Sequence, residues 1–517
     1  MILLVHSPVV KPSEPPPGIA KLSGVLKHFG IEVKILDLNL EGLLYLLKSP
    51  LKPSDTWTKR ASRNFSSNLE SLKTFKTYKS LDHYKRAVKD LNRLLEVTPS
   101  SKDIRLSLTN YKNLNLSPVK SKDLIRVAEQ PDANPFFPYL SERLLKVIKT
   151  EQPSLVGFSL NYLSQALCTF ALIGSVKREC PGIKVILGGG LITSWMKKPG
   201  WKNPLKGLVD HCVAGPGEYQ LLPLMGINCF EKTYCLPDYT AFPFGEYCSP
   251  GPILPYSSSS GCYWNKCSFC PEKAEGNSYT SVPVDETMHT LYALTKKIQP
   301  VLVHLLDNAL SPELLKAIAG HPLGTPWYGF TRITSHLTDF DFCRVLKQAG
   351  CVMLKLGLES GDQGVLDSLH KGIRLEEASR VLKSLKQAGI ATYVYLLFGT
   401  PSETIVKAKR TLDFIVKHSA YIDFLNLAIF NLTIYGSETE KVETKNFYEG
   451  DLSLYTDFFH PHGWNRIAVR EFLDKEFTRH PAIGSIVRKE PPFFTSNHAP
   501  FFVIKSQHPG DSTFPLP

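Results

Sequence analysis

The chain has 517 residues, which exceeds one ordinary hydrophobic core and predicts two to four domains. Its 43% hydrophobic and 11% aromatic residues exclude disorder over most of the length. The first residues have the pattern of a β-strand without a basic leader, and no apolar run reaches the about eighteen residues of a membrane span. We therefore expect a cytoplasmic protein that does not enter a membrane.

The net charge of +12 is concentrated in one segment. Residues 51–130 contain 17 Lys and Arg against 8 Asp and Glu. A solvated helical face or a contact with an acidic partner is the favoured interpretation of this segment. Nucleic-acid binding is the alternative.

The first part of the chain alternates between short apolar runs and helical patterns, which is typical of a doubly wound α/β domain. Such a domain binds ligands at the carboxyl ends of its strands. The segment at about 50–134 interrupts the alternation and is predicted to be a basic helical insertion. The predicted elements are a strand at 2–6, a helix at 20–29, strands at 32–38 and 154–160, a helix ending near Arg178, a strand at 183–187 and a short element at 207–214.

A second series of strands and helices follows a segment rich in Pro, Tyr and Ser. Two of its helices end in Lys-Gln-Ala-Gly, at Gly350 and Gly389, where glycine closes a helix. Five or six such units predict a full or partial parallel barrel with its site at the strands' carboxyl ends. The predicted strands are 301–306, 327–333, 352–358, 392–398 and 424–430, and the predicted helices are 311–319, 338–349, 375–388 and 404–418. We predict domains at 1–233, 234–435 with a linker at 234–255, and 436–517, where His460, His462 and His498 are expected to be structural more often than functional.

Three cysteines lie within nine residues just before the barrel series, at Cys262, Cys267 and Cys270. The odd total of eleven cysteines and this dense group favour a metal site in a reducing compartment over a disulfide framework. Three thiolates leave one iron of a [4Fe–4S] cluster open for a chelating ligand. Zinc is the main alternative, but no Cys or His follows within the next eighteen residues to complete a tetrahedral site.

The sequence Gly-Cys-Tyr-Trp-Asn-Lys-Cys-Ser-Phe-Cys at 261–270 resembles the cluster loop of radical S-adenosylmethionine (radical SAM) enzymes, with one extra residue between the first two cysteines. The resemblance implies that Phe269 lies beside the adenine. Trp-Tyr-Gly-Phe-Thr-Arg at 327–332 and Leu-Gly-Leu-Glu-Ser-Gly at 356–361 resemble later strand ends of these barrels. The resemblance then assigns Arg332 to the methionine carboxylate and Glu359 to the ribose, with Gly357 as a further cofactor contact.

The first 233 residues resemble the cobalamin-binding domain that precedes the barrel in one subclass of this family, the class B methyltransferases. The motifs that carry the resemblance lie after predicted strands, where glycine lets a flat ligand approach the backbone. No Asp-x-His-x-x-Gly motif occurs, so a histidine ligand to cobalt is not expected, and Tyr162 is the residue we place near the lower face of the cofactor. The implied cobalamin contacts are Ser159, Asn161, Tyr162, Gly188, Gly189, Gly190, Gly215, Gly217 and Glu218.

Together these resemblances imply a Rossmann-like cobalamin-binding domain, a partial (β/α)6 radical SAM barrel and a small C-terminal domain. The implied reaction is methylation of an unactivated carbon through a 5′-deoxyadenosyl radical and methylcobalamin. An external electron donor such as flavodoxin or ferredoxin is implied, with a peptide, protein or small molecule as substrate. The alternatives are a cobalamin-dependent cyclase or rearrangement enzyme, a metal-bearing nucleic-acid-binding protein, and a non-catalytic cobalamin sensor.

Overall fold

The computed structural model describes residues 1–51, 55–99, 101–137, 139–227, 234–446 and 449–507. They form two compact units. The first unit comprises Met1–Gly251 with Tyr448–Leu454 and Pro492–Thr495, and the second comprises Pro252–Phe447, Tyr455–Pro491 and Ser496–Pro517. The boundary between the first and second units therefore lies after Gly251, whereas the sequence placed the first domain boundary at 233. The residues after 435 are divided between the two units.

The first unit is built on a parallel five-stranded sheet in the order β2-β1-β5-β6-β7. This is a doubly wound order. The first connection runs from β1 to β2 on one side, and the next strand of this sheet along the chain, β5, lies on the other side of β1, so the order reverses between β1 and β5. A ligand of such a fold binds outside the carboxyl ends of these two strands. The strands are β1 (Ile2–His6), β2 (Val33–Asp37), β5 (Leu155–Ser159), β6 (Lys184–Gly188) and β7 (His211–Cys212).

Six helices accompany this sheet, and the predicted α/β alternation is confirmed. Residues 165–176 of α9 are all buried, so this helix is covered on every side and its polar residues there, such as Gln165 and Thr169, are hydrogen-bonded. In α1, Pro17 takes the first helical position, where its missing N–H costs nothing. The helices are α1 (Pro17–His28), α2 (Leu38–Lys48), α8 (Tyr139–Glu151), α9 (Leu163–Glu179), α10 (Gly190–Met196) and α11 (Leu221–Leu224).

The basic insertion folds as helices and a hairpin. Asp90 is buried in it and accepts hydrogen bonds from Trp57 Nε1 at 2.8 Å and Arg60 Nη2 at 2.6 Å. Arg93 pairs with Asp55 at 2.8 Å. These ion pairs engage two of the basic side chains within the insertion itself. Its elements are α3 (Thr56–Arg63), α4 (Phe65–Leu72), α5 (Phe75–Tyr78), α6 (Leu81–Val97), β3 (Ile104–Leu106), β4 (Tyr111–Asn113) and α7 (Ser121–Glu129).

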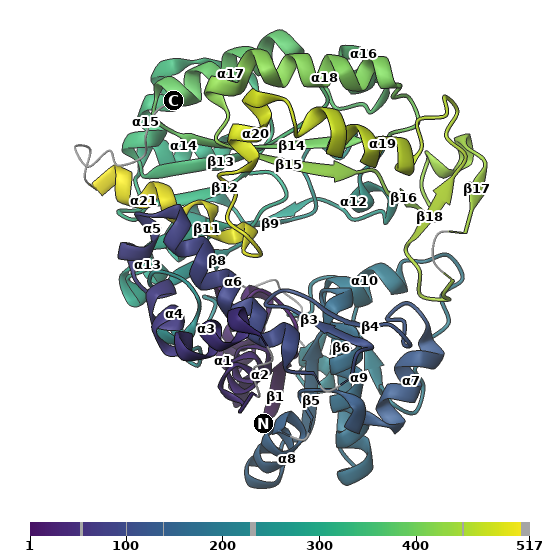
Figure 1. The fold of residues 1–517 in the computed structure, drawn as a ribbon. Helices are drawn as coiled ribbons and strands as arrows, with labels where there is room; N and C mark the ends of the chain where they lie inside the picture. The colour runs from purple at the N-terminus through teal and green to yellow at the C-terminus, as the bar shows by residue number, and fades with distance from the viewer. Residues whose placement is uncertain (52–54, 100, 138, 228–233, 447–448, 508–517) are drawn as a thin grey trace. The chain divides into compact units, whose positions relative to one another are not determined.

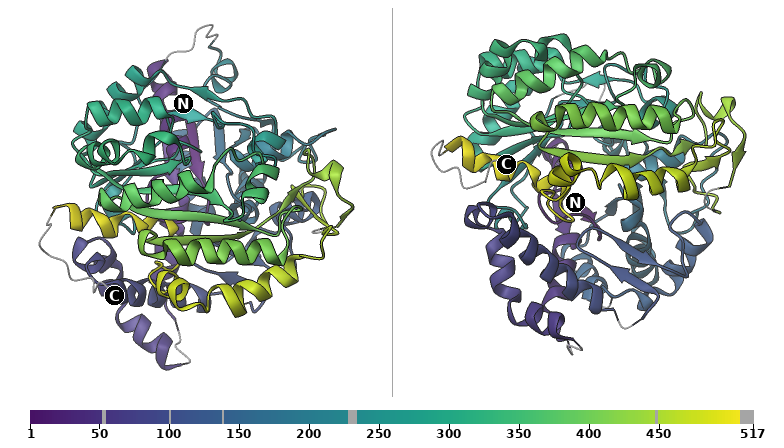
Figure 2. Two further views of the ribbon diagram at one scale, coloured as in Figure 1. Left: turned by 90° about the horizontal axis from the view of Figure 1, so that it is seen from above. Right: turned by 45° about the horizontal axis from the view of Figure 1, so that its top comes forward.

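The second unit contains an open, parallel six-stranded sheet in the order β15-β14-β13-β12-β11-β8. Sequential order with a helix between neighbours is the arrangement of the predicted partial (β/α)6 barrel. Helices α17 and α18 lie in one layer outside the sheet (Figures 1 and 2). The strands are β8 (Ile253–Tyr256), β11 (Leu302–Leu305), β12 (Trp327–Thr331), β13 (Cys351–Glu359), β14 (Ala391–Phe398) and β15 (Phe424–Ile429).

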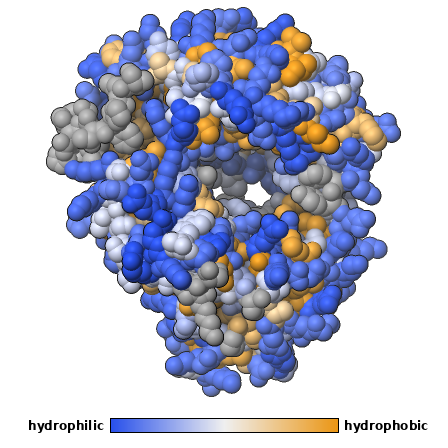
Figure 3. Space-filling model, in the orientation of Figure 1, coloured by the Kyte–Doolittle hydropathy of each residue, from blue (hydrophilic) through white to orange (hydrophobic). Residues whose placement is uncertain are grey.

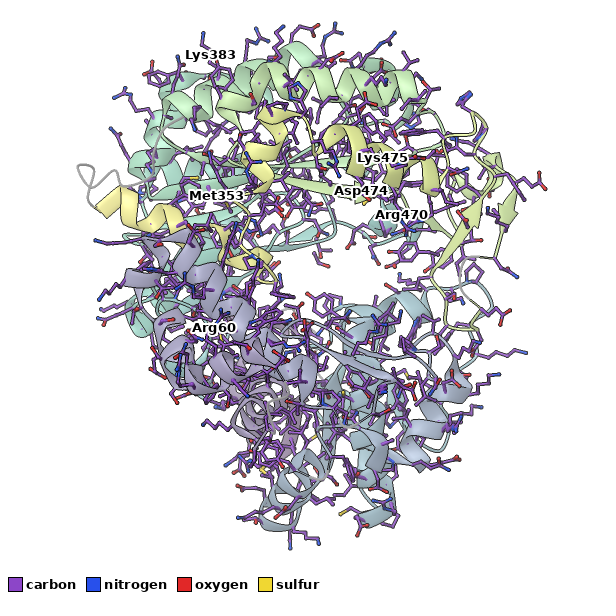
Figure 4. All side chains as sticks on the ribbon, viewed as in Figure 1. Arg60, Met353, Lys383, Arg470, Asp474 and Lys475 are labelled. Carbon is purple, nitrogen blue, oxygen red and sulfur yellow. The ribbon has the colours of Figure 1, made fainter. Side chains whose placement is uncertain are left out.

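The helices of this unit are amphipathic. In α17, Val381, Leu382 and Leu385 are buried, whereas Lys383 points away from the sheet and Met353 lies buried in β13 beneath the helices (Figure 4). Gly350 and Gly389 follow α15 and α17 with φ of 95° and 75°, as the Lys-Gln-Ala-Gly motifs predict. The helices are α12 (Pro271–Ala274), α13 (Val284–Ile298), α14 (Pro312–Gly320), α15 (Phe340–Gln348), α16 (Gln363–Ser368), α17 (Leu375–Gln387) and α18 (Ile405–His418).

The elements missed from the sequence include α2, α8, α10, α16, β8 and α13. The strand β8 lies in the segment expected to be a linker, and α13 was not predicted. The described residues of the same segment, 234–251, pack on the first unit, where Tyr247 OH donates to Asp37 at 2.6 Å and Lys27 pairs with Asp238 at 2.6 Å. Proline and tyrosine content therefore did not mark a free linker here, because the aromatic side chains are buried.

The remaining residues add small elements. Short strands β16, β18 and β17 form an antiparallel sheet, and β9 pairs with β10. On the face seen in Figure 3, hydrophilic residues dominate and hydrophobic patches are scattered. Among the residues that the structure describes, no helix has the length and apolar character needed to cross a bilayer. The elements are β9 (Ser259–Ser260), β10 (Thr280–Ser281), β16 (Leu432–Thr433), β17 (Thr444–Lys445), β18 (Tyr455–Phe458), α19 (Arg466–Phe472), a π-helical turn (Leu473–Phe477), α20 (Pro481–Val487), α21 (Pro500–Gln507) and 3-10 turns at Pro131–Ala133, Phe244–Glu246, Ser335–Thr338, Ser419–Tyr421, Thr439–Lys441 and Thr495–His498.

The packing of the insertion on the first sheet domain is testable at Gly174 of α9. A Cβ at this position would lie 1.9 Å from the carbonyl oxygen of Ala128 in α7. Gly174→Ala should lower the free energy of unfolding by about 1–3 kcal/mol, the usual cost of overpacking. Gly182→Ala is the control, because a Cβ there meets nothing within 4 Å. Equal thermal unfolding midpoints for both variants would contradict this contact.

Candidate functional site

Polar residues follow consecutive strands at one edge of the six-stranded sheet. Asp307 lies two residues after β11, Arg332 directly follows β12, and Glu359 is the last residue of β13. All three are buried. Since the carboxyl ends of parallel strands share one edge, these side chains gather where barrel enzymes have their active sites.

The cysteine loop at 261–270 is attached to this edge by hydrogen bonds. The Asp307 carboxylate accepts from the hydroxyls of Ser258 at 2.6 Å and Ser259 at 2.5 Å, just before the loop. Asn308 Nδ2 donates to the carbonyl of Gly261 at 3.3 Å. Asp307 and Asn308, which follow β11, therefore fix the conformation of residues 258–261 at the start of the cysteine loop.

The segment between Cys262 and Cys267, which has one extra residue, makes a turn. Asn265 adopts a left-handed conformation with φ of 43°. The Trp264 side chain contacts residues 370–372. Trp264 Nε1 donates to the carbonyl of His370 at 3.1 Å, and its ring lies over Gly372. A Cβ on Gly372, whose φ is 66°, would lie 2.2 Å from the ring, so glycine is required there.

Two of the cysteine thiols are in a desolvated environment. Burial raises the pKa of Cys267 and of Cys270, while the positive charges of Lys371 and Arg332 oppose the effect at Cys267. Within the described part of the chain, no three metal-binding side chains converge on one point. Cys262, Cys267 and Cys270 lie on one loop, and a cluster bonds each cysteine to a separate iron atom.

Glu359 forms a buried ion pair that the sequence did not predict. Its Oε1 accepts from Lys371 Nζ at 2.8 Å, and both side chains are nearly inaccessible to solvent. Glu359 itself has φ of 69° at a register shift in β13, and strained residues and bulges are common at functional sites. A Cβ on Gly357 would lie 2.7 Å from Glu359 Oε1 and 2.8 Å from Lys371 Nζ. Gly357 therefore provides the space for the ion pair.

Phe269 connects the cysteine loop to the end of the sheet. Its half-buried ring packs on a cluster of Phe430, Leu432 and Phe458, beyond the end of β15. Lys371 Nζ lies 5.7 Å from the centre of the same ring. Phe269 and Glu359, assigned by resemblance to the adenine and the ribose, and Gly357, a further predicted cofactor contact, thus all lie around Lys371.

Arg332 lies with the cysteine loop. Its Nη1 is 3.9 Å from Cys267 Sγ, its Nη2 donates to the carbonyl of Lys371, and its Cζ is 4.1 Å from the centre of the Trp264 ring. The structure therefore brings Arg332 to the cysteines and to the Glu359 partner.

The turn after β14 contains a buried carboxyl group. Glu403 Oε2 accepts from the Gly399 N–H at 2.5 Å and from Trp464 Nε1 at 2.9 Å. Burial raises the pKa of Glu403 to about 7. His460 Nε2 lies 2.9 Å from the Thr400 carbonyl, and its Nδ1 accepts from the backbone of Trp464 at 3.3 Å. The predicted structural role of His460 agrees with these bonds.

The carboxyl edge of the first sheet carries several of the predicted cobalamin contacts. Asn161 Nδ2 donates to Ser159 Oγ at 3.0 Å, and Asn161 Oδ1 accepts from the Gly190 N–H at 2.9 Å. A Cβ on Gly189 would lie 2.5 Å from the Leu160 carbonyl oxygen. The loops that follow β5 and β6 are therefore locked together at Ser159, Asn161, Gly188, Gly189 and Gly190.

The other predicted contacts divide into two groups. Gly215 donates its N–H to Thr193 Oγ1, whose hydroxyl donates to the Gly189 carbonyl, so it belongs to the same edge. Tyr162 is 56% exposed at the start of α9, beside Leu163, which is 39% exposed. In contrast, Glu218 is buried in a 2.5 Å ion pair with Lys21 of α1, and Gly217 packs near Leu22. These last two residues hold the loop to α1.

The barrel region matches one known family. Residues 256–415 match the model of the radical SAM superfamily. The second unit carries a radical SAM domain. The cysteine loop, β11 to β14 and the Glu359–Lys371 pair all lie within this radical SAM match.

Sequence relatives cover the chain only in part. The chain is 23% identical over 251 residues to an uncharacterized methyltransferase of Pyrococcus horikoshii, covering 46% of this chain and 54% of the relative. It is 25% identical over 176 residues to the bacteriochlorophyllide d C-12(1)-methyltransferase of Chlorobaculum tepidum, with 32% and 38% covered. It is 26% identical over 157 residues to the anaerobic magnesium-protoporphyrin IX monomethyl ester cyclase of Rubrivivax gelatinosus, with 29% and 28% covered. The chain thus spans about half or less of the length of these relatives.

The fold extends beyond the radical SAM domain in a solved structure. The radical SAM methyltransferase TsrM of Kitasatospora setae, determined with tryptophan substrate and a SAM analogue bound, matches with a TM-score of 0.52 at 15% identity. The match covers 87% of this chain and 79% of TsrM. The two proteins share the multidomain α/β fold.

Two residues of the site were not found from the sequence. Lys371 lies in an ordinary turn after α16, and only the fold brings it to Glu359. Trp264 was noted only as part of the cysteine motif, and its contact with Arg332 depends on the turn at Asn265. The unusual length of the loop was the one sequence signal for Trp264.

The raised pKa of Glu403 predicts a pH-dependent stability. The folded pKa of about 7 exceeds the ordinary value of 4.5, so its stabilising contribution is present below pH 4.5 and is lost as pH rises through 7. Glu403→Gln keeps the acceptor oxygen without the charge. Its unfolding free energy should exceed that of the wild type by on the order of 3 kcal/mol at pH 8, and match it near pH 4. Thermal unfolding at both pH values measures this, with the exposed Glu376→Gln as control. A lower midpoint for Glu403→Gln at pH 8 would show that the fold requires the charged form.

Proposed function

We propose that this protein is a radical SAM enzyme that uses a [4Fe–4S] cluster, S-adenosylmethionine and cobalamin to methylate a carbon atom. The observation that carries the proposal is the three-cysteine loop attached to the carboxyl edge of the barrel, next to the buried Glu359–Lys371 pair. The named methyltransferase relatives and the TsrM fold support it.

Each residue of the radical SAM site has a defined task in this proposal. Cys262, Cys267 and Cys270 would bind three irons, which leaves one iron open to S-adenosylmethionine. Phe269 would contact the adenine. Lys371 occupies Glu359 Oε1, so Oε2 is the atom we assign to the ribose hydroxyls. When bound, the cluster supplies an electron to S-adenosylmethionine and cobalamin supplies the methyl group, while the protein orients the reactants and excludes water.

The first unit suits a flat ligand at the carboxyl ends of β5 and β6. A Cβ at Gly190 would meet only ordinary contacts, so the backbone there is accessible, and the exposed side chains of Tyr162 and Leu163 offer an apolar surface. We assign cobalamin to this edge and retain Tyr162 as the residue near its lower face. Gly217 and Glu218 are not part of this assignment, because their contacts are with α1.

A cyclase is the second candidate function, since the Rubrivivax relative closes a ring. The mass of the product separates the two reactions, because methylation adds one methyl group.

We infer that an external one-electron donor of the flavodoxin or ferredoxin class serves the cluster, and that the protein works in a reducing cytoplasm.

Replacement of single cysteines tests the cluster. Cys262→Ala, Cys267→Ala or Cys270→Ala should abolish the iron–sulfur absorbance of anaerobically reconstituted protein and the formation of 5′-deoxyadenosine with S-adenosylmethionine and dithionite. Cys180→Ala, outside the loop, should retain both. Zinc without iron in the wild type, or no 5′-deoxyadenosine in the presence of substrate, would refute the radical proposal.

A blocking substitution tests the cobalamin site. A Cβ on Gly190 meets only the ordinary contacts of Asn161 at 3.8 Å and 4.0 Å, so the fold tolerates a side chain there. Gly190→Leu should weaken hydroxocobalamin binding at least about tenfold, about 1.4 kcal/mol, without lowering the unfolding midpoint. Gly182→Leu, at an open exposed position before β6, should bind like the wild type. Unchanged binding by Gly190→Leu would place the ligand elsewhere.

A further inference from the structure

The guanidinium of Arg332 is held against the cysteine loop from three sides. Nη1 lies 3.9 Å from Cys267 Sγ, Nη2 donates to the Lys371 carbonyl, and the flat face of the group lies on the Trp264 ring. The Arg332 side chain is only 5% exposed. Arginine remains protonated in proteins, so a fixed positive charge stands beside this thiol.

The contacts around Trp264 hold the guanidinium in this orientation. The indole is anchored by its hydrogen bond to the His370 carbonyl and by the absence of a side chain at Gly372. Lys266 Nζ lies 4.8 Å from the same ring centre. Trp264, which lies in the lengthened part of the loop, thus packs against the Arg332 guanidinium.

These contacts compete with the role that resemblance assigns to Arg332. A guanidinium that binds a carboxylate presents two parallel N–H groups to it. Here the two terminal nitrogens are directed to a backbone carbonyl and a cysteine sulfur of the protein itself. The geometry points to Arg332 as a positioning residue for the Cys267 thiolate that raises the reduction potential of the cluster, in place of a ligand to the methionine carboxylate. This inference rests on the proposed cluster.

The physical basis is the charge balance of reduction. Reduction adds one negative charge to the cluster, and a cation buried near a ligand sulfur attracts that charge more strongly than the same cation would in water. Hydrogen bonds to cluster sulfurs are among the factors that set the potential. Lys371 contributes to the same arrangement, because its carbonyl accepts from Arg332 while its ammonium pairs with Glu359.

The test is a redox titration of the reconstituted full-length protein without S-adenosylmethionine, followed by electron paramagnetic resonance. Arg332→Gln should reduce the equilibrium constant of one-electron reduction about tenfold, a fall of about 59 mV in midpoint potential. Arg332→Lys keeps the charge and should lie between Gln and the wild type. Arg374→Gln is the matched control, since it removes an exposed arginine charge just before α17, where the side chain pairs with Glu376.

The outcomes separate the inference from the proposed function. A wild-type protein without a cluster refutes the proposed function, and this inference with it. A wild-type cluster with an unchanged potential in Arg332→Gln, together with weaker S-adenosylmethionine binding in equilibrium dialysis, would overturn the inference and return Arg332 to the carboxylate. If Arg332→Gln loses iron while the unfolding midpoint of its apo form is unchanged, the anchoring of Cys267 by Arg332 is supported. If that apo form is unfolded, Arg332→Lys decides: an unchanged potential with weaker S-adenosylmethionine binding overturns the inference, and a lowered potential with unchanged binding supports it.

Discussion

The ion pair between Lys371 and Glu359 is the interaction on which the geometry of the radical SAM site depends. Removing two charges from water costs several kcal/mol for each, so a buried pair is maintained only where its geometry is good and neighbouring groups support it. At 2.8 Å, with Gly357 leaving space beside both charged groups, this pair meets the requirement. It also holds Glu359 in a left-handed backbone conformation that is unfavourable for a residue with a side chain.

Lys371 extends this arrangement to the cysteine loop. Its ammonium lies near the Phe269 ring, and its carbonyl accepts from Arg332, which stands beside Cys267. The loop at 369–372 thereby contacts the cysteine loop, the residue assigned to adenine and the residue assigned to ribose. A rigid framework of this kind suits a reaction in which a reactive radical must meet one defined carbon atom.

Several features followed from local sequence. The strands β1, β5, β11 and β14 are short apolar runs, and the helices between them show clear periodicity, so local pattern and tertiary structure agree. The three cysteines were predicted as cluster ligands from their spacing, and Glu359 was predicted as a cofactor contact from its motif at a strand end. In contrast, β8 was expected to lie in a linker because Pro and Ser surround it, yet its burial in the sheet overrides that composition. Cobalamin contacts at Gly217 and Glu218 were inferred from a loop motif whose contacts are with Lys21 and Leu22.

The sequence by itself determined the α/β class, the order of the elements and the chemistry of the cluster loop, because these depend on periodicity and on residues close together in the chain. Only the tertiary structure decided the partners of Glu359 and Arg332 and the course of the lengthened loop around Trp264. Lys371 is twelve residues from Glu359, and Arg332 is 65 residues from Cys267. Such contacts are created by strand register and by turns with left-handed residues such as Asn265, and no local pattern encodes them.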